Sequence, residues 1–264
     1  MCSSDLEEGK SKNCRIAIAY SLVKEVDKKG NSTWKIVPLD HGQVSIYFTA
    51  DKETSNLRFH LHAPFASTVA RDSVRDSQAN DQLRDQIAKL VVESLTDIRD
   101  QGLLTVDFLA VLPNSADNLS AFYKPIRDKI IQAFNEEALT PTRDEHSHAP
   151  AKKLLQAKAS LKALLSADDI KFLVKHDEEP PQWAVARALQ GTKVERFMSG
   201  LAITDWDVEQ FVELLQEKAS IKWRPSYYIP SLNEEFKSWL SQKSLDWHQE
   251  LYALLFSEIG RAHV

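Results

Sequence analysis

Alternating apolar and polar positions in the first part of the chain predict a series of short β-strands. Residues 15–20 and 34–37 are rich in β-branched and aromatic side chains, and the turn-forming segment 28–32 lies between them. We expect these two strands to pair as a hairpin with a longer loop. Residues 44–48 and 57–61 predict two further strands. The pattern therefore predicts a mixed or antiparallel sheet of at least these four strands.

The hydrophobic period changes to that of an amphipathic helix after residue 80. One face of this helix contains Leu83, Ile87, Leu90, Val91, Leu95 and Ile98. We expect Asn80 to cap the helix at its start and Gly102 to take the left-handed conformation that ends it. Residues 104–112 are mostly apolar and are followed by Pro113, which predicts a buried strand.

A second helix is expected to begin at Pro125, because proline suits the first turn of a helix. Its apolar face contains Ile126, Ile130, Ile131 and Phe134. Residues 7–139 are therefore predicted to form an α+β domain, transducer-like in outline, whose helices cover one face of the sheet.

Residues 140–152 contain two prolines and several charged side chains, which is typical of a linker. Residues 153–257 show no convincing strand. Helix starts that resemble capping boxes recur at Ser166–Asp169, Thr192–Glu195, Thr204–Asp207 and Ser231–Glu234. Prolines at 180, 181 and 225 separate the expected helices. We therefore expect a separate all-α domain of about five or six short helices to follow the α+β domain.

The composition is that of an ordinary folded protein: 264 residues, 43% hydrophobic and 27% charged. The formal net charge of −5 argues against a nucleic-acid partner, because non-specific binding to nucleic acid depends on a basic surface. A membrane partner is not expected either, because no stretch approaches the ~18 consecutive apolar residues of a membrane-spanning helix.

The two ends of the chain are predicted to be translated adapter DNA rather than native protein. Residues 1–6 can be encoded by GTG TGC TCT TCC GAT CTC, and the reverse complement of this DNA encodes residues 258–263. The same DNA resembles a common sequencing-library adapter. We therefore assign residues 1–6 and 258–264 to the adapter and expect a piece of a longer protein. Cys14 is then the only native cysteine, which favours a reducing, cytoplasmic setting.

Motifs for common enzyme chemistry are absent from the sequence. The seven glycines are scattered, so no Gly-rich loop can bring several backbone amides to a phosphate. Neither a Gly-x-Ser-x-Gly nor a His-Glu-x-x-His motif occurs. His60 and His62 are the most metal-like pair, because alternate residues of a strand share a face. No cysteine or acidic residue nearby completes a ligand set, which favours a structural or solvent-facing role for both histidines over a metal.

The segment from Ala66 to Asp76 carries two Arg-Asp pairs. If this segment is helical, Arg71 and Arg75 share a face with Asp72 and Asp76 beside them. Two guanidinium groups held by carboxylates can present a fixed fork to an anion. A solvated cluster of ion pairs explains the same residues and is the commoner arrangement in proteins.

Tryptophans occur mainly in the second half of the chain, at 183, 206, 223, 239 and 247. Their positions favour packing in a core. A groove that binds a partner is the alternative, because exposed tryptophan is enriched at interfaces.

Several segments together resemble bacterial sacsin-like proteins, which are relatives of the gyrase, heat-shock chaperone, histidine kinase and MutL class of ATPases. The resemblance begins at Leu57–Ala66 and the two Arg-Asp pairs, and it extends through the helix at 83–98 and the segment 104–112. Glu195–Leu201 and Trp239–Lys243 are similar to the helical part of the same large proteins. The resemblance covers about residues 15 to 257.

The resemblance implies that this chain is the middle and helical region that follows an ATP-binding domain. The Asn-x-x-x-Asp and Asp-x-Gly-x-Gly motifs of that domain are absent here, so the chain itself is expected to hold no cofactor. ATP and Mg²⁺ are implied for the longer protein, and the partners implied are the upstream domain and a protein client. In such chaperones a middle-domain arginine can reach the γ-phosphate, and Arg71 and Arg75 are the candidates by position.

Two other functions remain open from the sequence. The chain can be an interaction scaffold that binds a partner through its helical domain and has no ATP-linked activity. It can also be a small enzyme that uses His60 and His62, although the missing third ligand makes this the weakest reading. Whether the longer protein is an active ATPase is left open.

Overall fold

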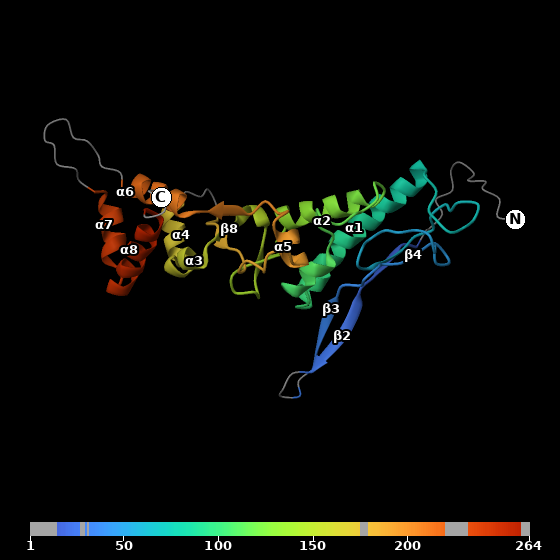
Figure 1. The fold of residues 1–264 in the computed structure, drawn as a ribbon, viewed down its shortest axis with the longest axis horizontal. Helices are drawn as coiled ribbons and strands as arrows, with labels where there is room; N and C mark the ends of the chain where they lie inside the picture. The colour runs from blue at the N-terminus through green and yellow to red at the C-terminus, as the bar shows by residue number, and fades with distance from the viewer. Residues whose placement is uncertain (1–14, 27–29, 31, 175–178, 220–231, 260–264) are drawn as a thin grey trace. The chain divides into compact units, whose positions relative to one another are not determined.

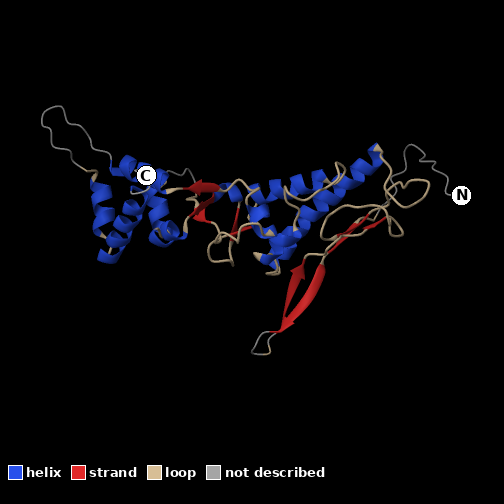
Figure 2. Cartoon of the chain, viewed as in Figure 1, coloured by secondary structure: helices blue, strands red, loops and turns tan. Residues whose placement is uncertain are grey.

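The chain folds into two compact units in a computed structural model. The structure describes residues 15–26, 30, 32–174, 179–219 and 232–259 (Figure 1). Unit 1 comprises residues 1–133 and 189–200, and unit 2 comprises residues 134–188 and 201–264. Both helices and small sheets are present, which confirms the predicted α+β class (Figure 2). Of the predicted adapter residues 1–6 and 258–264, residues 1–6 and 260–264 lie outside the described part of the chain, and 258 and 259 end the last helix.

Unit 1 contains a three-stranded sheet in the order β1–β5–β4. Strand β5 (His60–His62) lies in the middle, antiparallel to β1 (Ala17–Ala19) and parallel to β4 (Val44–Ser45). The sheet has three strands rather than at least four, and the strands expected at 15–20, 44–48 and 57–61 are shorter than predicted. The chain turns at Ile46, whose N–H donates to the carbonyl of Phe48, so the expected strand 44–48 ends early.

Gly42 allows its backbone to lie directly against the backbone of residues 57–59. Its N–H donates to the carbonyl oxygen of Leu57 over 2.7 Å. A Cβ atom at this position would lie 2.0 Å from the carbonyl oxygen of Phe59. Leu57 and Phe59 are fully buried without belonging to a ladder, so their apolar pattern reports burial rather than strand pairing.

A two-stranded hairpin is formed by β2 (Ser21–Val26) and β3 (Ser32–Val37). The predicted pairing of residues 15–20 with 34–37 is wrong. Ala17–Ala19 instead pairs with β5. Tyr20 alone separates this strand from β2. Gly30 lies between β2 and β3 with a φ of +84°, consistent with the predicted turn.

Helix α1 (Gln78–Asp100) matches the predicted helix and extends slightly beyond it. Ile87, Val91, Leu95 and Ile98 are buried on its inner face. Ser77, rather than Asn80, caps its start, because the Ser77 side chain accepts the N–H of Asn80. Gly102 follows the helix with a φ of +71°, as predicted.

Three further helical segments lie wholly or mostly in unit 1. Helix α2 (Lys124–Glu136) buries Ile126, Ile130 and Phe134, as its pattern predicts. Residues 104–112 do not form the expected strand; they contain the 3₁₀ helix η1 (Asp107–Val111), which α5 (Lys193–Met198) contacts. The Thr105 hydroxyl accepts the N–H of Phe108 and favours a helical turn over an extended chain.

Residues 140–152 are not the linker that the sequence predicted. Strands β6 (Thr140–Pro141) and β7 (His148–Ala149) form a small hairpin in unit 2, and the 3₁₀ helix η2 (Ala151–Lys153) follows. The Asp144 carboxylate stabilises the turn by accepting the N–H groups of His146 and Ser147. These bonds hold the pKa of Asp144 well below its usual range.

Unit 2 also contains a parallel three-stranded sheet, so the prediction of an all-α second domain is wrong. Strand β8 (Leu154–Ala157) lies between β9 (Gln182–Trp183) and β10 (Thr204–Trp206). All four residues of β8 are buried, and a short apolar run of this kind has no period that separates a strand from a helix. The α+β class therefore applies to both units.

The helices of unit 2 are α3 (Ala159–Leu164), α4 (Ala167–Leu173), α6 (Val208–Ala219), α7 (Glu234–Ser241) and α8 (Leu245–Ile259). The capping box predicted at Ser166–Asp169 is present at the start of α4. Helix α6 is instead capped by Asp207, which exchanges bonds with Gln210, while Thr204 lies in β10. Asn233 caps α7, and Ser231 lies outside the described residues.

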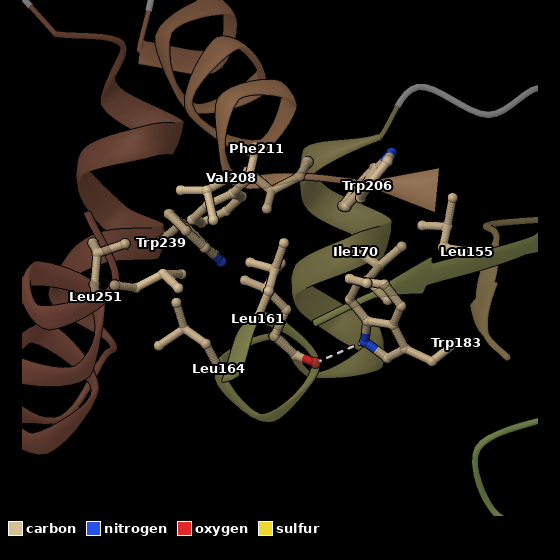
Figure 3. Packing of buried hydrophobic residues seen from close by; sticks show 14 of the residues in the cluster. Leu155, Leu161, Leu164, Ile170, Trp183, Trp206, Val208, Phe211, Trp239 and Leu251 are labelled. Atoms are coloured by element: carbon tan, nitrogen blue, oxygen red, sulfur yellow. Dashed lines mark hydrogen bonds between the residues drawn. The ribbon is translucent and has the colours of Figure 1, made fainter. Parts of the chain in front are cut away.

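Aliphatic side chains together with several aromatic rings fill the core of unit 2 (Figure 3). Trp183 and Trp206 meet edge to face at 5.8 Å, and the Trp183 indole N–H donates to the carbonyl oxygen of Leu165. Trp239 is buried beside Phe236. The prediction that these three tryptophans pack in a core is confirmed, and Trp223 lies outside the described residues.

Candidate functional site

The loop that joins β5 to α1 contains both candidate arginines. The sequence places Arg71 and Arg75 on one face only if this loop is helical, and it is not helical. Ser67 and Val74 form an antiparallel bridge, and the N–H of Thr68 donates to the carbonyl of Ser73. Arg71 lies in the turn between them with a φ of +61°. We call residues 66–75 the arginine loop.

Local hydrogen bonds explain why this segment turns rather than continuing as a helix. The hydroxyl groups of Thr68 and Ser73 both donate to the Asp72 carboxylate. The ammonium group of Lys52 binds the other oxygen of Asp72 at 2.8 Å. The bond from Lys52, followed by that from Thr68, lowers the pKa of Asp72 to about 2. Short polar side chains of this kind compete with helical backbone bonds.

Asn80 holds the two ends of the arginine loop together. Its side-chain oxygen accepts the N–H of Ala66 at 2.8 Å. Its side-chain nitrogen donates to the carbonyl oxygens of Ala66 and Arg75, at 2.9 and 2.6 Å. Asn80 is completely buried at the start of α1. The residue that the sequence marked as a helix cap therefore positions Arg75 instead.

A cavity of about 320 Å³ lies at the base of the arginine loop. Its wall includes Glu53, Arg75, Asp76, Asp81, Arg84 and Phe122. The wall includes Arg75 but not Arg71, so the two arginines do not form a common fork here. Three carboxylates and two guanidinium groups therefore share this small space.

Arg84 is fixed in the cavity wall. Its guanidinium binds Asp81 at 2.7 Å and Asp85 at 2.8 Å, and it lies 5.3 Å from the centre of the Phe122 ring. Arg84 was not among the residues that the sequence pattern singled out. An Asp three residues before an Arg on a helix is a detectable signal, but it is typical of ordinary surface ion pairs.

Glu53 is also held by neighbouring groups. One oxygen accepts the N–H of Val74 at 2.7 Å, and the other accepts the hydroxyl of Tyr123 at 2.9 Å. Burial, together with the Glu53 carboxylate, raises the pKa of Tyr123 above its usual range. Tyr123 therefore remains a hydrogen-bond donor, and Glu53 links the arginine loop to the segment before α2.

Arg75 and Asp76 differ from the other charged groups of the cavity. Among the described residues, neither side chain makes a hydrogen bond or an ion pair. The guanidinium of Arg75 is exposed, while the backbone carbonyl of the same residue is anchored by Asn80. Arg75 thus combines a fixed backbone with a cation that is available to an external anion.

The start of β1 lies at the same end of the sheet as the arginine loop. Ala17 pairs with His62, and the chain continues from His62 through Phe65 into the loop. Strand pairing therefore brings the chain just before β1 close to the segment that leads to Arg75.

The two histidines lie on β5, and no third metal-ligating side chain joins them in the described part of the chain. The Nδ1 atom of His60 accepts the N–H of Gln43 at 3.0 Å. The ring of His62 lies edge to face with Tyr47, with 6.4 Å between ring centres. Within the described residues, no cluster of three or more His, Cys, Asp or Glu side chains is placed to hold a metal ion. The contacts seen are those of packed, partly exposed histidines.

No helix within the described part of the chain is both long and apolar enough to cross a membrane.

Comparisons with protein-family models, with curated proteins and with solved structures find no match to this chain.

Proposed function

We propose that this chain is the non-catalytic middle and helical region of a sacsin-like, chaperone-type ATP-binding protein. In this proposal Arg75 contacts a phosphate held by an upstream ATP-binding domain and links the nucleotide state to movement of unit 1. The proposal is carried by one observation: Arg75 has a backbone anchored by Asn80 and a guanidinium without a partner among the described residues. The setting proposed is cytoplasmic.

The cavity by itself does not fit a nucleotide. Glu53, Asp76 and Asp81 contribute three carboxylates to its wall, and these would repel a triphosphate. The described residues therefore fit a single contact from Arg75 to a phosphate that is bound elsewhere. ATP with Mg²⁺ would supply the phosphoryl group to be transferred. The role of this chain is to place the positive charge of Arg75 where negative charge develops during phosphoryl transfer.

The position of the arginine loop supports this role. An upstream domain would join the chain before β1, and Ala17 at the start of β1 pairs with His62. The loop that follows His62 is thus near the point of attachment. A charge that reaches across a domain boundary also favours the closed arrangement of the domains, because the contact exists only when they meet.

Sequencing of the source DNA upstream of the chain is the first test. We expect the open frame to continue and to encode Asn-x-x-x-Asp followed by Asp-x-Gly-x-Gly. In the protein with that domain, Arg75→Ala is expected to lower the kcat for ATP by at least about 100-fold. Thermal stability should stay unchanged because the Arg75 side chain is exposed.

Arg127→Ala is the control, because the only described side-chain partner of Arg127 is the neighbouring Asp128 and the residue lies on α2, outside the cavity wall. Arg71→Ala tests the second candidate of the sequence analysis, and we expect a smaller effect because Arg71 lies outside the cavity wall. An upstream frame without both motifs, or full ATP turnover in both arginine variants, would overturn the proposal.

An interaction scaffold without ATP-linked activity is the second candidate. The burial of Trp183, Trp206 and Trp239 argues against a tryptophan-lined groove in unit 2. Helix α8 nevertheless exposes Leu245, Tyr252 and Phe256, whose spacing of seven and four residues places them on one side. Retained binding of a partner by a chain without the upstream domain, together with no effect of nucleotide, would favour this candidate.

A further inference from the structure

The β2–β3 hairpin exposes large apolar side chains. Leu22 is 49% exposed, Trp34 is 56% exposed and Val26 is 65% exposed. The hairpin extends away from α1 (Figures 1 and 2). A two-stranded ribbon is marginally stable in water, and exposed apolar strands favour association with another chain. The stability of unit 1 does not explain why these apolar side chains are exposed.

The strand register gathers these residues on one face. Leu22 pairs with Ile36, Lys24 with Trp34, and Val26 with Ser32. Directly paired residues of antiparallel strands point to the same side. Ile36 lies on the same face but is only 3% exposed, so the part of the face nearest to it is covered within unit 1. We call the exposed part of this face, formed by Leu22, Lys24, Val26 and Trp34, the Trp34 face.

The opposite face of the hairpin has a different character. Its Lys35 binds Glu25 at 3.8 Å and Asp107 of η1 at 2.6 Å. These bonds pair the only carboxylate of the two strands, Glu25, with Lys35 and tie Lys35 to η1. The Trp34 face has no carboxylate in β2 or β3. Its single charged group, the Lys24 ammonium, has no ion-pair partner among the described residues.

This charge pattern decides between two occupants. A second copy of the hairpin would pack around a two-fold axis, with the same residues on both sides. The central pair of the Trp34 face is Lys24 and Trp34, so face-to-face packing of two copies would place two ammonium groups in one interface with no counter-ion from β2 or β3. A segment that brings its own carboxylate avoids this cost and offers Lys24 a charged hydrogen-bond partner.

We propose that the Trp34 face binds an extended, apolar segment of another protein that carries one acidic side chain. The apolar side chains cover Leu22, Val26 and Trp34, and the carboxylate binds Lys24. Tryptophan provides a large contact area and is common among the residues that dominate binding energy. The exposed strands suit an extended partner, since no third strand pairs with β2 or β3 in the described chain.

This surface would provide the client side of the proposed chaperone-type function, but it does not depend on the ATP site. The test of peptide binding requires no nucleotide. A failure to bind peptide therefore does not contradict the proposed role of Arg75, and the reverse also holds. The probe is a fluorescein-labelled peptide in which threonine alternates with apolar residues around one central aspartate. Fluorescence anisotropy with the full chain measures its dissociation constant.

We expect saturable binding of this peptide, and at least about a 10-fold loss of affinity for Trp34→Ala. A second peptide carries lysine in place of the aspartate and should bind more weakly to the wild type. Lys24→Glu should reverse this preference between the two peptides. The reversal is a gain as well as a loss, so misfolding cannot produce it. Val23→Ala, an apolar truncation on the opposite face, should leave both affinities unchanged.

Three results would overturn the proposal. One is equal affinity for the aspartate and lysine peptides. Another is undiminished binding of the aspartate peptide by Trp34→Ala. The third is sedimentation of the chain as a dimer that Trp34→Ala dissociates, because the face would then be occupied by a second copy.

Discussion

The two units of this chain use their buried polar groups in different ways. In unit 2 the buried Lys162 donates to the side chain of Gln156 and to the carbonyl oxygens of Ala184 and Val185. In unit 1 the buried Asn80 holds the arginine loop and leaves the guanidinium of Arg75 exposed. Burial of a polar side chain therefore does not by itself mark a site. The informative feature is what its hydrogen bonds hold in place.

Unit 2 contains a second internally satisfied group, Asp169. Its carboxylate accepts bonds from the Trp239 indole, from the Lys243 ammonium and from Ser166. Burial acts to raise the pKa of Asp169, but the bonds from Lys243, Ser166 and Trp239 outweigh it, so the pKa is lowered. The network joins α4 to α7 and the segment after it, which is a structural task.

The largest loss of stability expected from this comparison is caused by replacing Asp169. Asp169→Ala removes one partner of a buried ion pair and the cap of α4, and should lower the free energy of unfolding by about 3–5 kcal/mol. Urea unfolding followed by the fluorescence of the buried tryptophans of unit 2 measures this change. Asp168→Ala, at an exposed neighbouring position, is the control. A loss near 1 kcal/mol or less would contradict the structural role.

Lys162 gives a pH-dependent test of the same unit. Burial, with the charges of Arg143 and Arg187, lowers the pKa of Lys162 from 10.5 to about 8. Between these two values the unfolded chain binds a proton that the folded chain lacks. The free energy of unfolding should therefore rise with pH through this window, by roughly 3 kcal/mol in all.

Comparison of the wild type with Lys162→Met isolates this contribution, because other groups titrate in both proteins. Urea unfolding between pH 8 and pH 10 should show a steeper rise for the wild type. Parallel curves would mean that the ammonium ion of Lys162 is not destabilised by its surroundings.

Replacement of Asn80 should lower the stability by a smaller amount and loosen the arginine loop of unit 1. Asn80→Ala leaves the buried backbone groups of Ala66 and Arg75 without their side-chain partner, which costs about 2 kcal/mol. Hydrogen exchange of the amides at 66–75 should become faster. Gln82→Ala, exposed on the same helix, should change neither quantity. Unchanged exchange in the Asn80 variant would remove its positioning role.

The candidate site shows where sequence patterns stop being informative. The sequence located the Arg71 and Arg75 segment and the start of α1, since both depend on residues close together in the chain. It did not reveal the cavity, because Glu53, Arg84 and Phe122 come from separate segments and meet only in the folded unit. It placed Arg71 and Arg75 on one face only on the condition that the segment is helical. The bonds of Asp72 to Lys52 and Thr68, which favour a turn instead, do not follow from a hydrophobic period.

The sequence by itself determined the α+β class, the amphipathic helices α1 and α2 and the capping box of α4, because each depends on spacing within one turn or one helical face. Tertiary structure decided which apolar segments became strands. Residues 104–112 form η1 and Leu154–Ala157 forms β8, although both are short apolar runs. Strand pairing requires a partner elsewhere in the chain, and a local pattern does not identify that partner. Tertiary structure likewise decided that Asn80 anchors the loop of Arg75 rather than capping its own helix.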